Sequence, residues 1–351
     1  MIKPTWQRDA LKAPFPWFGG KRRVADRVWK ALGDVVNYVE PFFGSGAVLL
    51  GRPANHNGTC ETVNDADIYI ANFWRALERE PNEVACYADQ PVNECNLIAI
   101  HTWLVNTGRE RIEKMESDKD YFDAEVAGLW VWGIDAWIGS GWCSGKGPWK
   151  LVDGKLLDVR QLPHLGNAGR GVSRQLPHLS DAGVGVSRKR PNLGDVVRGE
   201  IYDYFIALAA RLRKVRVCCG DWSRVVSNGA LHYGNTVGIF LDPPYLGSVR
   251  AADLYSVDDH TISIAVRDWA IANGDNPRYR IVLAGYWQEH CEAMPDTWTA
   301  YRYSANKSYG TTAAIGQKKG NDANRHNECL WYSPHCLTAE LRQADMRFGL
   351  G

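Results

Sequence analysis

The segment Asp242-Pro243-Pro244-Tyr245 has the most readily interpreted chemistry, because it directly follows an apolar run at 237–241. Such a run is typical of a buried strand, and α/β proteins bind ligands beyond the carboxyl ends of their strands. The two prolines have no N–H and favour an extended backbone, which leaves carbonyl oxygens beside the Asp242 carboxylate. These acceptors suit a planar –NH₂ group, and Tyr245 can stack on the ring that carries it. Adenine fits this description, whereas the alternative interpretation is a proline-rich turn.

A second candidate site is the sequence EPFFGSG at 40–46. Its glycines, Gly44 and Gly46, allow a ligand to approach the backbone closely, and the N-terminus of a following helix offers free N–H groups. About twenty residues later Asp65 ends a second expected strand, where a carboxylate can accept both hydroxyls of a ribose. Taken alone, the loop also fits a nicotinamide-binding fold or a tightly packed turn.

The elements that must position these residues alternate between helices and strands. In the first part of the chain we expect a helix, a strand, a helix and a strand at 24–32, 35–39, from 47, and at 61–63. After residue 200 we expect helices at 201–212 and 259–272, and strands at 215–219, 237–241, 280–284 and 328–332. This alternation predicts an α/β fold with one catalytic domain formed by 1–80 and 200–351, interrupted by an insert at 81–199.

The expected insert has a different composition. It begins with a helical, tryptophan-rich part and continues through a glycine-rich stretch into a 14-residue repeat, RQLPHLGNAGRGVS and RQLPHLSDAGVGVS, with a decayed third copy from 188. Proline and several glycines in each unit exclude long helices. The repeat region at 160–199 has seven Arg or Lys against two Asp, although the whole chain has a net charge of +1. This segment therefore predicts a DNA-binding surface, the alternative being a flexible, duplicated linker.

The composition of the 351-residue chain, with 45% hydrophobic and 23% charged residues, is that of a globular protein. No apolar run approaches the roughly 18 residues of a membrane helix, and we expect a cytoplasmic protein without a membrane partner. The nine cysteines form no C-x-x-C pair, so we expect neither a zinc site nor a disulfide framework.

Taken together, the motifs resemble those of the Dam-like DNA adenine methyltransferases. The matching segments are PWFGGK at 16–21, EPFFGSG at 40–46, Asn64-Asp65, Gly220-Asp221-Trp222 and LDPPY at 241–245, in the order of that family. The resemblance covers roughly 14–80 and 200–335. It implies a class I S-adenosylmethionine-dependent methyltransferase fold, Rossmann-like with a mostly parallel sheet, in which 81–199 is the target-recognition insert.

The resemblance also implies roles for individual residues. Asp242 and the Pro243 carbonyl hold the target amine, Pro244 belongs to the same catalytic motif, and Tyr245 stacks on the extruded base. S-adenosyl-L-methionine is the implied cofactor, and its expected binding residues are Trp17, Lys21, Glu40, Phe42, Gly44, Gly46, Asn64, Asp65, Asp221 and Trp222. The residues expected to contact DNA are Arg160, Arg170, Arg174, Arg188, Lys189, Arg190 and Lys307. The expected partner is double-stranded DNA, without an obligatory protein partner.

The expected reaction extrudes the adenine from the duplex and transfers the methyl group directly in line, without a metal or a covalent enzyme intermediate. Duplicated loops favour a short or relaxed target site. Alternatives are methylation of RNA adenine or of a protein glutamine amide, although the glutamine-modifying enzymes typically carry Asn where this chain has Asp242. A nicotinamide oxidoreductase would leave the Asp-Pro-Pro-Tyr motif unexplained. A non-catalytic DNA-binding module would leave the complete set of pocket residues unexplained.

Overall fold

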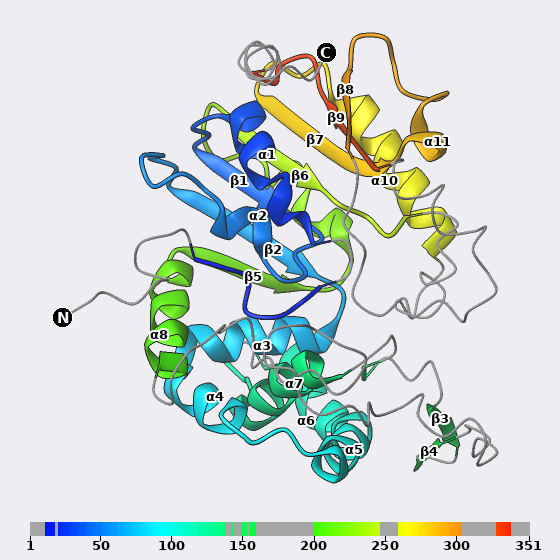
Figure 1. Ribbon diagram of the computed structural model, residues 1–351. Helices are drawn as coiled ribbons and strands as arrows, with labels where there is room; N and C mark the ends of the chain where they lie inside the picture. The colour runs from blue at the N-terminus through cyan, green and yellow to red at the C-terminus, as the bar shows by residue number, and fades with distance from the viewer. Residues whose placement is uncertain are drawn as a thin grey trace.

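The computed structural model describes residues 11–17, 20–118, 120–137, 142–143, 149–152, 155–158, 200–245, 259–303 and 328–337. Within these residues the central feature is a seven-stranded sheet (Figure 1). Its strands are β1 (Asn37–Glu40), β2 (Cys60–Asp65), β5 (Val215–Cys219), β6 (Val237–Leu241), β7 (Tyr279–Tyr286), β8 (Thr299–Tyr303) and β9 (Glu328–Tyr332).

The strand order is β5-β2-β1-β6-β7-β9-β8. The first five strands in this order pair in parallel, and β9 pairs antiparallel with both β7 and β8. Along the chain, β2 and then β5 are added on one side of β1, and β6 and then β7 are added on its other side. This confirms the predicted α/β fold with a mostly parallel, Rossmann-like sheet.

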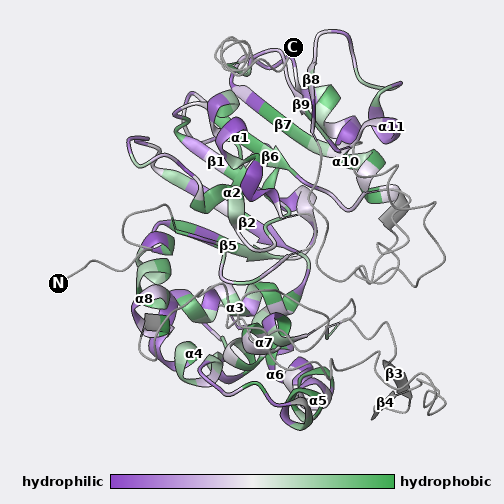
Figure 2. Cartoon of the chain, in the orientation of Figure 1, coloured by the Kyte–Doolittle hydropathy of each residue, from purple (hydrophilic) through white to green (hydrophobic). Residues whose placement is uncertain are grey.

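Both faces of the sheet are buried, because alternate side chains of each strand enter different hydrophobic clusters. In β6, Phe240 packs with residues of the helices on one face, while Ile239 and Leu241 pack on the other face with Val266. In Figure 2 most of β6 and β7 has the green colour of hydrophobic residues. Such two-sided burial explains why the central strands read as continuous apolar runs in the sequence.

The hydrophobic cluster on the first face contains residues of α1 (Ala25–Leu32), the short α2 (Ala47–Leu50), α3 (Ile68–Arg79) and α8 (Glu200–Leu212). Helices α4 (Pro81–Ala88) and α7 (Ala124–Ala136) extend the same cluster by packing on α3 and α8. The other face is covered by α10 (Asp259–Asn273) and the 3₁₀ turn η6 (Trp222–Val225). The remaining helical segments are η2 (Lys21–Arg23), α5 (Glu94–Trp103), η3 (Leu104–Gly108), α6 (Arg109–Ile112), η4 (Glu113–Glu116) and α11 (Trp287–His290).

Helices α3 to α8 gather beyond the β5 edge of the sheet, and they include the start of the expected insert (Figure 1). Phe73 of α3, Trp130 of α7 and Phe205 of α8 are buried in one aromatic cluster with Phe15. The described part of 81–136 thus shares a core with helices on both sides of it in the chain. That 81–199 is the target-recognition insert stays a prediction.

Most of the expected elements have the predicted bounds within one or two residues. The strands at 215–219, 237–241 and 328–332 agree in full. The first strand begins at Asn37 rather than at residue 35, because Val35 is still in the turn that leaves α1, with its N–H bonded to the Gly33 carbonyl. Two features were not predicted from the sequence, namely β8 and the two-stranded hairpin of β3 (Trp149–Val152) and β4 (Lys155–Asp158).

The 14-residue repeat at 160–199 lies outside the described residues, as does Lys307. The expected DNA contacts at Arg160, Arg170, Arg174, Arg188, Lys189 and Arg190 therefore stay predictions from the sequence. Among the helices of the described ranges, none is both long enough and apolar enough to cross a membrane.

Candidate active site

Four of the five segments singled out in the sequence lie at the carboxyl ends of neighbouring parallel strands, and the fifth, at 16–21, precedes α1. These strands are β5, β2, β1 and β6, and the direction in which the chain adds strands changes between β1 and β6. Such a change leaves a crevice at the carboxyl edge, because the connections on its two sides run over opposite faces. The predicted site residues that the structure describes therefore come from loops and strand ends on a single edge of the sheet.

Asp242 directly follows the fully buried strand β6, and its side chain is 20% exposed. Its Oδ1 atom is 3.0 Å from the Nζ atom of Lys21 and accepts a hydrogen bond of 3.1 Å from the Tyr245 hydroxyl. Pro243 and Pro244 between them are buried. Burial raises the pKa of Asp242, and the Lys21 ammonium group opposes that rise.

Lys21 reaches this position because η2 places it against the sheet, where its side chain is only 4% exposed. Its Nζ atom is 4.9 Å from the centre of the Tyr245 ring. The preceding turn is closed by a hydrogen bond of 3.0 Å from the Gly20 N–H to the Trp17 carbonyl. Lys21, expected in the cofactor pocket, thus contacts the two polar side chains of the Asp-Pro-Pro-Tyr motif.

The glycine-rich loop follows β1, and its two glycines have positive φ angles, 49° at Gly44 and 71° at Gly46. A Cβ atom added at Gly44 would lie 2.5 Å from the indole ring of Trp17. Trp74 holds the same loop from the other side by donating a 3.0 Å hydrogen bond to the Gly44 carbonyl. The predicted cofactor residues Trp17, Gly44 and Gly46 are therefore brought together, and the close approach requires glycine at 44.

Asp65, the last residue of β2, is turned toward this loop. Its carboxylate accepts hydrogen bonds from the backbone N–H groups of Gly44 at 2.8 Å and Asp67 at 2.9 Å. Burial and the nearby Asp67 carboxylate raise the pKa of Asp65 to about 7, against these two hydrogen bonds. Such a carboxyl group gains most from a ligand that donates further hydrogen bonds to its ionised form.

Asn64 joins the ends of three strands. Its Nδ2 atom donates to the Pro41 carbonyl at 3.1 Å and to the Gly220 carbonyl at 2.9 Å. Its Oδ1 atom is buried and has no hydrogen-bond partner among the described residues. A buried acceptor of this kind is costly unless a ligand or water supplies a donor.

Glu40 at the end of β1 is buried, and its Oε2 atom accepts a 2.8 Å hydrogen bond from the Tyr38 hydroxyl. Burial raises the pKa of Glu40 well above its ordinary value. Glu40, Asp65 and Asp242 therefore form a set of carboxyl groups along one edge, all with raised pKa values.

The aromatic side chains of the site lie at both ends of this set. Phe42 and Trp222 are stacked, with ring centres 6.2 Å apart, and Asp221 caps η6 by accepting from the Ser223 N–H. At the other end, Tyr245 packs edge-on against Tyr286, with ring centres 4.7 Å apart. Tyr286, the last residue of β7, was not among the predicted site residues, because the expected strand ended at 284.

Part of the chain is similar to known adenine-specific DNA methyltransferases. Residues 17–118 match the model of the D12 class N6 adenine-specific DNA methyltransferases. A 95-residue segment is 29% identical to the DNA N-6-adenine-methyltransferase of Escherichia phage P1, and it covers 27% of this chain. The matched segment spans only 12% of the phage protein's length. The predicted resemblance to adenine methyltransferases is confirmed, and the family match includes Trp17, Lys21, the glycine-rich loop and Asp65.

Proposed function

We propose that this chain is an S-adenosylmethionine-dependent methyltransferase that methylates the exocyclic N6 amine of adenine in DNA. The observation that carries the proposal is the shared edge of the sheet, where Asp242 and Tyr245 follow β6 while the Gly44–Asp65 contact lies beyond β1 and β2. A methyl donor and an acceptor amine must meet, and neighbouring strand ends offer them adjoining places.

The residues beyond β1 and β2 fit S-adenosylmethionine. The Asp65 carboxylate accepts hydrogen bonds from two backbone N–H groups, and an ionised carboxylate can accept about four. It can therefore also accept hydrogen bonds from ribose hydroxyls. The buried, unpartnered Oδ1 atom of Asn64 is a further acceptor at this edge. When bound, S-adenosylmethionine supplies an activated methyl group on a positively charged sulfur. Trp17, Phe42 and Trp222 would provide aromatic surfaces around it.

Asp242 and the Pro243 carbonyl would accept the two protons of the target amine. The nitrogen lone pair of adenine is delocalised into the ring, and two such acceptors favour a pyramidal nitrogen whose lone pair is available. They also stabilise the positive charge that develops on the nitrogen, and they are in place before the reaction starts. Lys21 would have a supporting role, because its charge favours the ionised form of Asp242 and opposes the rise in pKa that burial causes.

Tyr245 would stack on the extruded adenine, and its T-shaped contact with Tyr286 holds the Tyr245 ring in its orientation. Extrusion is expected because the amine inside a duplex is out of reach of an enzyme side chain, and unstacking costs a few kcal/mol. A DNA substrate is favoured over RNA by the name of the phage relative and by the family description. DNA contacts by the 14-residue repeat, and the cytoplasmic location, remain predictions from the sequence.

Incubation of the whole chain with methyl-labelled S-adenosylmethionine and one nucleic acid at a time tests this function. The substrates are duplex DNA, single-stranded DNA and RNA of matched sequence, each digested to nucleosides after the reaction. We expect label in N6-methyldeoxyadenosine from DNA and none in RNA. Label in cytosine, or adenine labelled only in RNA, would contradict the proposal. A heat-treated sample of the chain controls for chemical methylation by the cofactor.

A further inference from the structure

The 3₁₀ turn η2 presents two arginines beside the candidate active site. Consecutive residues of such a turn point about 120° apart, so a residue that points inward is followed by two that point outward. Lys21 points inward to Asp242, and Arg22 and Arg23 are exposed. Two guanidinium groups are thus placed on the surface immediately next in the chain to a residue that contacts the catalytic motif.

A hollow of about 340 Å³ adjoins Arg22. Lys12 also lines it, together with Asp26 and the small residues Ala13, Ala47 and Gly51. Neither Lys12 nor Arg22 forms an ion pair with another described residue, while Asp26 is paired with Lys30 at 2.6 Å. The hollow is therefore lined by two cations whose charge the lining acid does not neutralise, and its small side chains leave room for a bulky anion.

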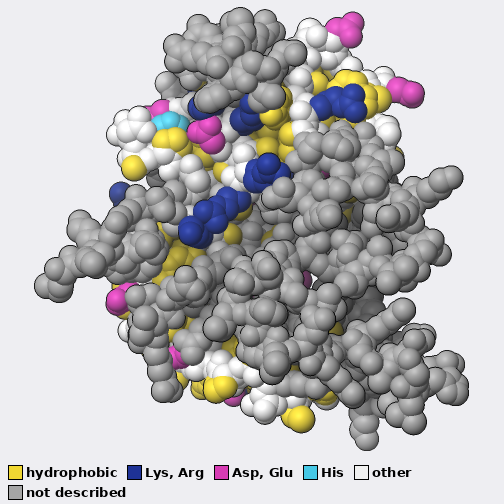
Figure 3. Space-filling model, viewed as in Figure 1, with side chains coloured by type: hydrophobic (Ala, Val, Ile, Leu, Met, Phe, Trp, Pro, Cys, Tyr) yellow, Lys and Arg dark blue, Asp and Glu magenta, His cyan; other side chains and the backbone are white. Residues whose placement is uncertain are grey.

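Basic side chains also gather on the face of the molecule that α1 and α2 cover. Figure 3 shows Lys and Arg side chains gathered on the face where Figure 1 places α1 and α2. The chain as a whole has a net charge of only +1, so this concentration is local. A local excess of cations favours association with a polyanion even when the total charge is balanced.

We propose that Lys12, Arg22 and Arg23 bind phosphates of the target strand on either side of the extruded adenosine. The inference rests on the proposed function and names the surface by which that site holds its substrate. Extrusion rotates a nucleotide about its own backbone, so the flanking phosphates must be held at the mouth of the base pocket. Contacts of this kind position the strand without reading its sequence. The position of Arg22 next to Lys21 meets that requirement.

The salt dependence of DNA binding by the whole chain tests this surface. The variants are Arg22→Ala, Lys12→Ala and the pair together, with Arg213→Ala as the matched control. Arg213 is exposed and follows α8, so it lies at the opposite edge of the sheet from the candidate site. The control removes the same charge from the molecule without touching the hollow. Arg22→Lys restores the charge at the tested position.

We expect the slope of log affinity against log salt to fall by about one for each of Arg22 and Lys12 removed. The ratio of wild-type affinity to the affinity of each single variant should therefore be about threefold larger at 50 mM salt than at 200 mM salt. Arg22→Lys should keep most of the wild-type slope, and S-adenosylmethionine affinity should be unchanged in all variants.

If Arg22→Ala and Arg213→Ala had equal slopes of log affinity against log salt, the proposed phosphate-binding surface would be wrong. The proposed function would be unaffected by that result. A wild-type chain that does not bind duplex DNA would overturn both. Methylation of DNA by wild type, with unchanged binding by the Lys12→Ala, Arg22→Ala double variant, would place the phosphate contacts elsewhere.

Discussion

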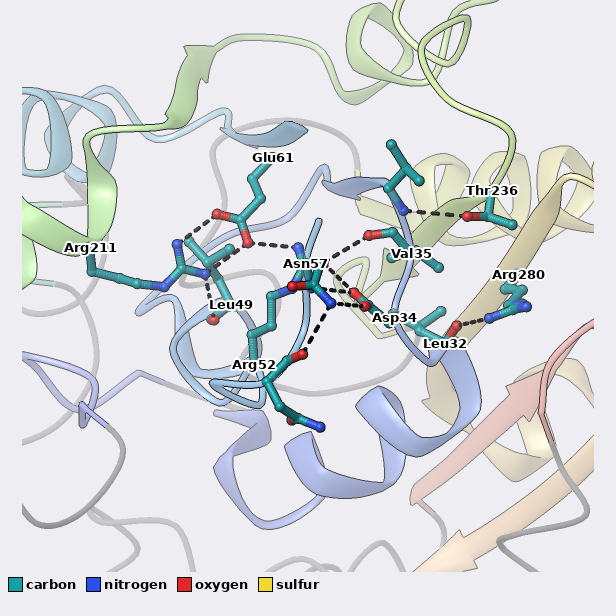
Figure 4. A network of polar contacts seen from close by, with 12 residues as sticks. Leu32, Asp34, Val35, Leu49, Arg52, Asn57, Glu61, Arg211, Thr236 and Arg280 are labelled. Atoms are coloured by element: carbon teal, nitrogen blue, oxygen red, sulfur yellow. Dashed lines mark hydrogen bonds and ion pairs between the residues drawn. The ribbon is translucent and has the colours of Figure 1, made fainter. Parts of the chain in front are cut away.

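Buried carboxyl groups at the two edges of the central sheet differ in their charged partners and in the direction of their pKa shifts. At the amino edge, Glu61 near the start of β2 accepts a hydrogen bond from Arg52 at 2.9 Å and two from Arg211 at 2.6 and 2.8 Å (Figure 4). The arginines continue into the backbone, since Arg52 donates to the Val35 carbonyl and Arg211 to the Leu49 carbonyl. Burial alone would raise the pKa of Glu61, but the two arginines lower it.

At the carboxyl edge, no described arginine side chain forms an ion pair with Glu40, Asp65 or Asp242. Glu40 accepts from a tyrosine hydroxyl and Asp65 from backbone N–H groups, while Asp242 has the single cation Lys21. Burial therefore dominates, and the pKa values of all three groups are raised. Their carboxylate oxygens are buried with few hydrogen-bond donors and little positive charge around them, which favours binding of a ligand that brings donors or positive charge.

The comparison separates stability from function within one sheet. The ion pairs of Glu61 with two arginines connect α2, β2 and α8. At the opposite edge the carboxyl groups have fewer donors and cations, so a ligand can supply further hydrogen bonds or positive charge. Substitution of carboxyl groups at the two edges should consequently have different effects, and three experiments can break or sharpen this distinction.

The largest effect is expected from Asp242→Ala. Loss of a preorganised acceptor for the target amine should lower the rate of methyl transfer by about 10²–10³-fold, while S-adenosylmethionine affinity is largely kept. The unfolding midpoint should fall less than in a variant of Glu61, because Asp242 pairs with the single cation Lys21 and burial already disfavours its charge. Single-turnover rates and cofactor titration measure the two parts. Transfer at more than a tenth of the wild-type rate would exclude the proposed role of Asp242.

Glu61→Gln should reverse that pattern. Removing the shared acidic partner leaves Arg211 without its counter-charge and Arg52 with only Asp34 at 3.6 Å, and should lower the free energy of unfolding by about 3 kcal/mol. The methylation rate of the folded variant should stay near that of wild type. Urea unfolding measures the stability, with the exposed Glu292→Gln as the matched control.

The stability difference between wild type and Glu61→Gln also depends on pH in a definite direction. The folded-state pKa of Glu61 is lowered, so its stabilising contribution is present above the ordinary value of 4.5 and is lost as the pH falls through the lowered pKa. Equal stability of Glu61→Gln and Glu292→Gln at neutral pH would refute the role assigned to the amino edge.

The smallest of the three effects concerns Asp65. Its folded-state pKa is raised to about 7, so a ligand that needs the carboxylate must displace a proton below that pH. S-adenosylmethionine affinity should rise by up to about tenfold per unit as the pH approaches 7, and should level above it. Asp65→Asn should bind about 10–100-fold more weakly at pH 8, with a flatter pH dependence. Isothermal titration between pH 6 and 8 provides the measurement, and an unaltered pH profile in Asp65→Asn would assign the titration to another group.

Much of the candidate site could be predicted because its residues stand at the ends of strongly apolar strands. The strand at 237–241 predicts the position of Asp242, and the glycines at 44 and 46 predict a loop that a ligand can approach closely, where the structure has positive φ angles. Tyr286 was missed because the expected strand ended at 284, two residues before it, and only strand order places it beside Tyr245. β8 was missed because its pairing with β9 depends on residues far away in the chain.

The sequence by itself determined the alternation of elements, the motifs and their order along the chain, because hydrophobic periodicity and glycine or proline content act over a few residues. Only the tertiary structure decided which charges meet. Lys21 is 221 positions before Asp242 in the chain, yet their side chains are 3.0 Å apart. Glu61 and Arg211 are likewise joined only by the parallel pairing of β2 with β5. Burial and charge neighbours set the pKa of a carboxyl group, and both come from strand order rather than from local sequence.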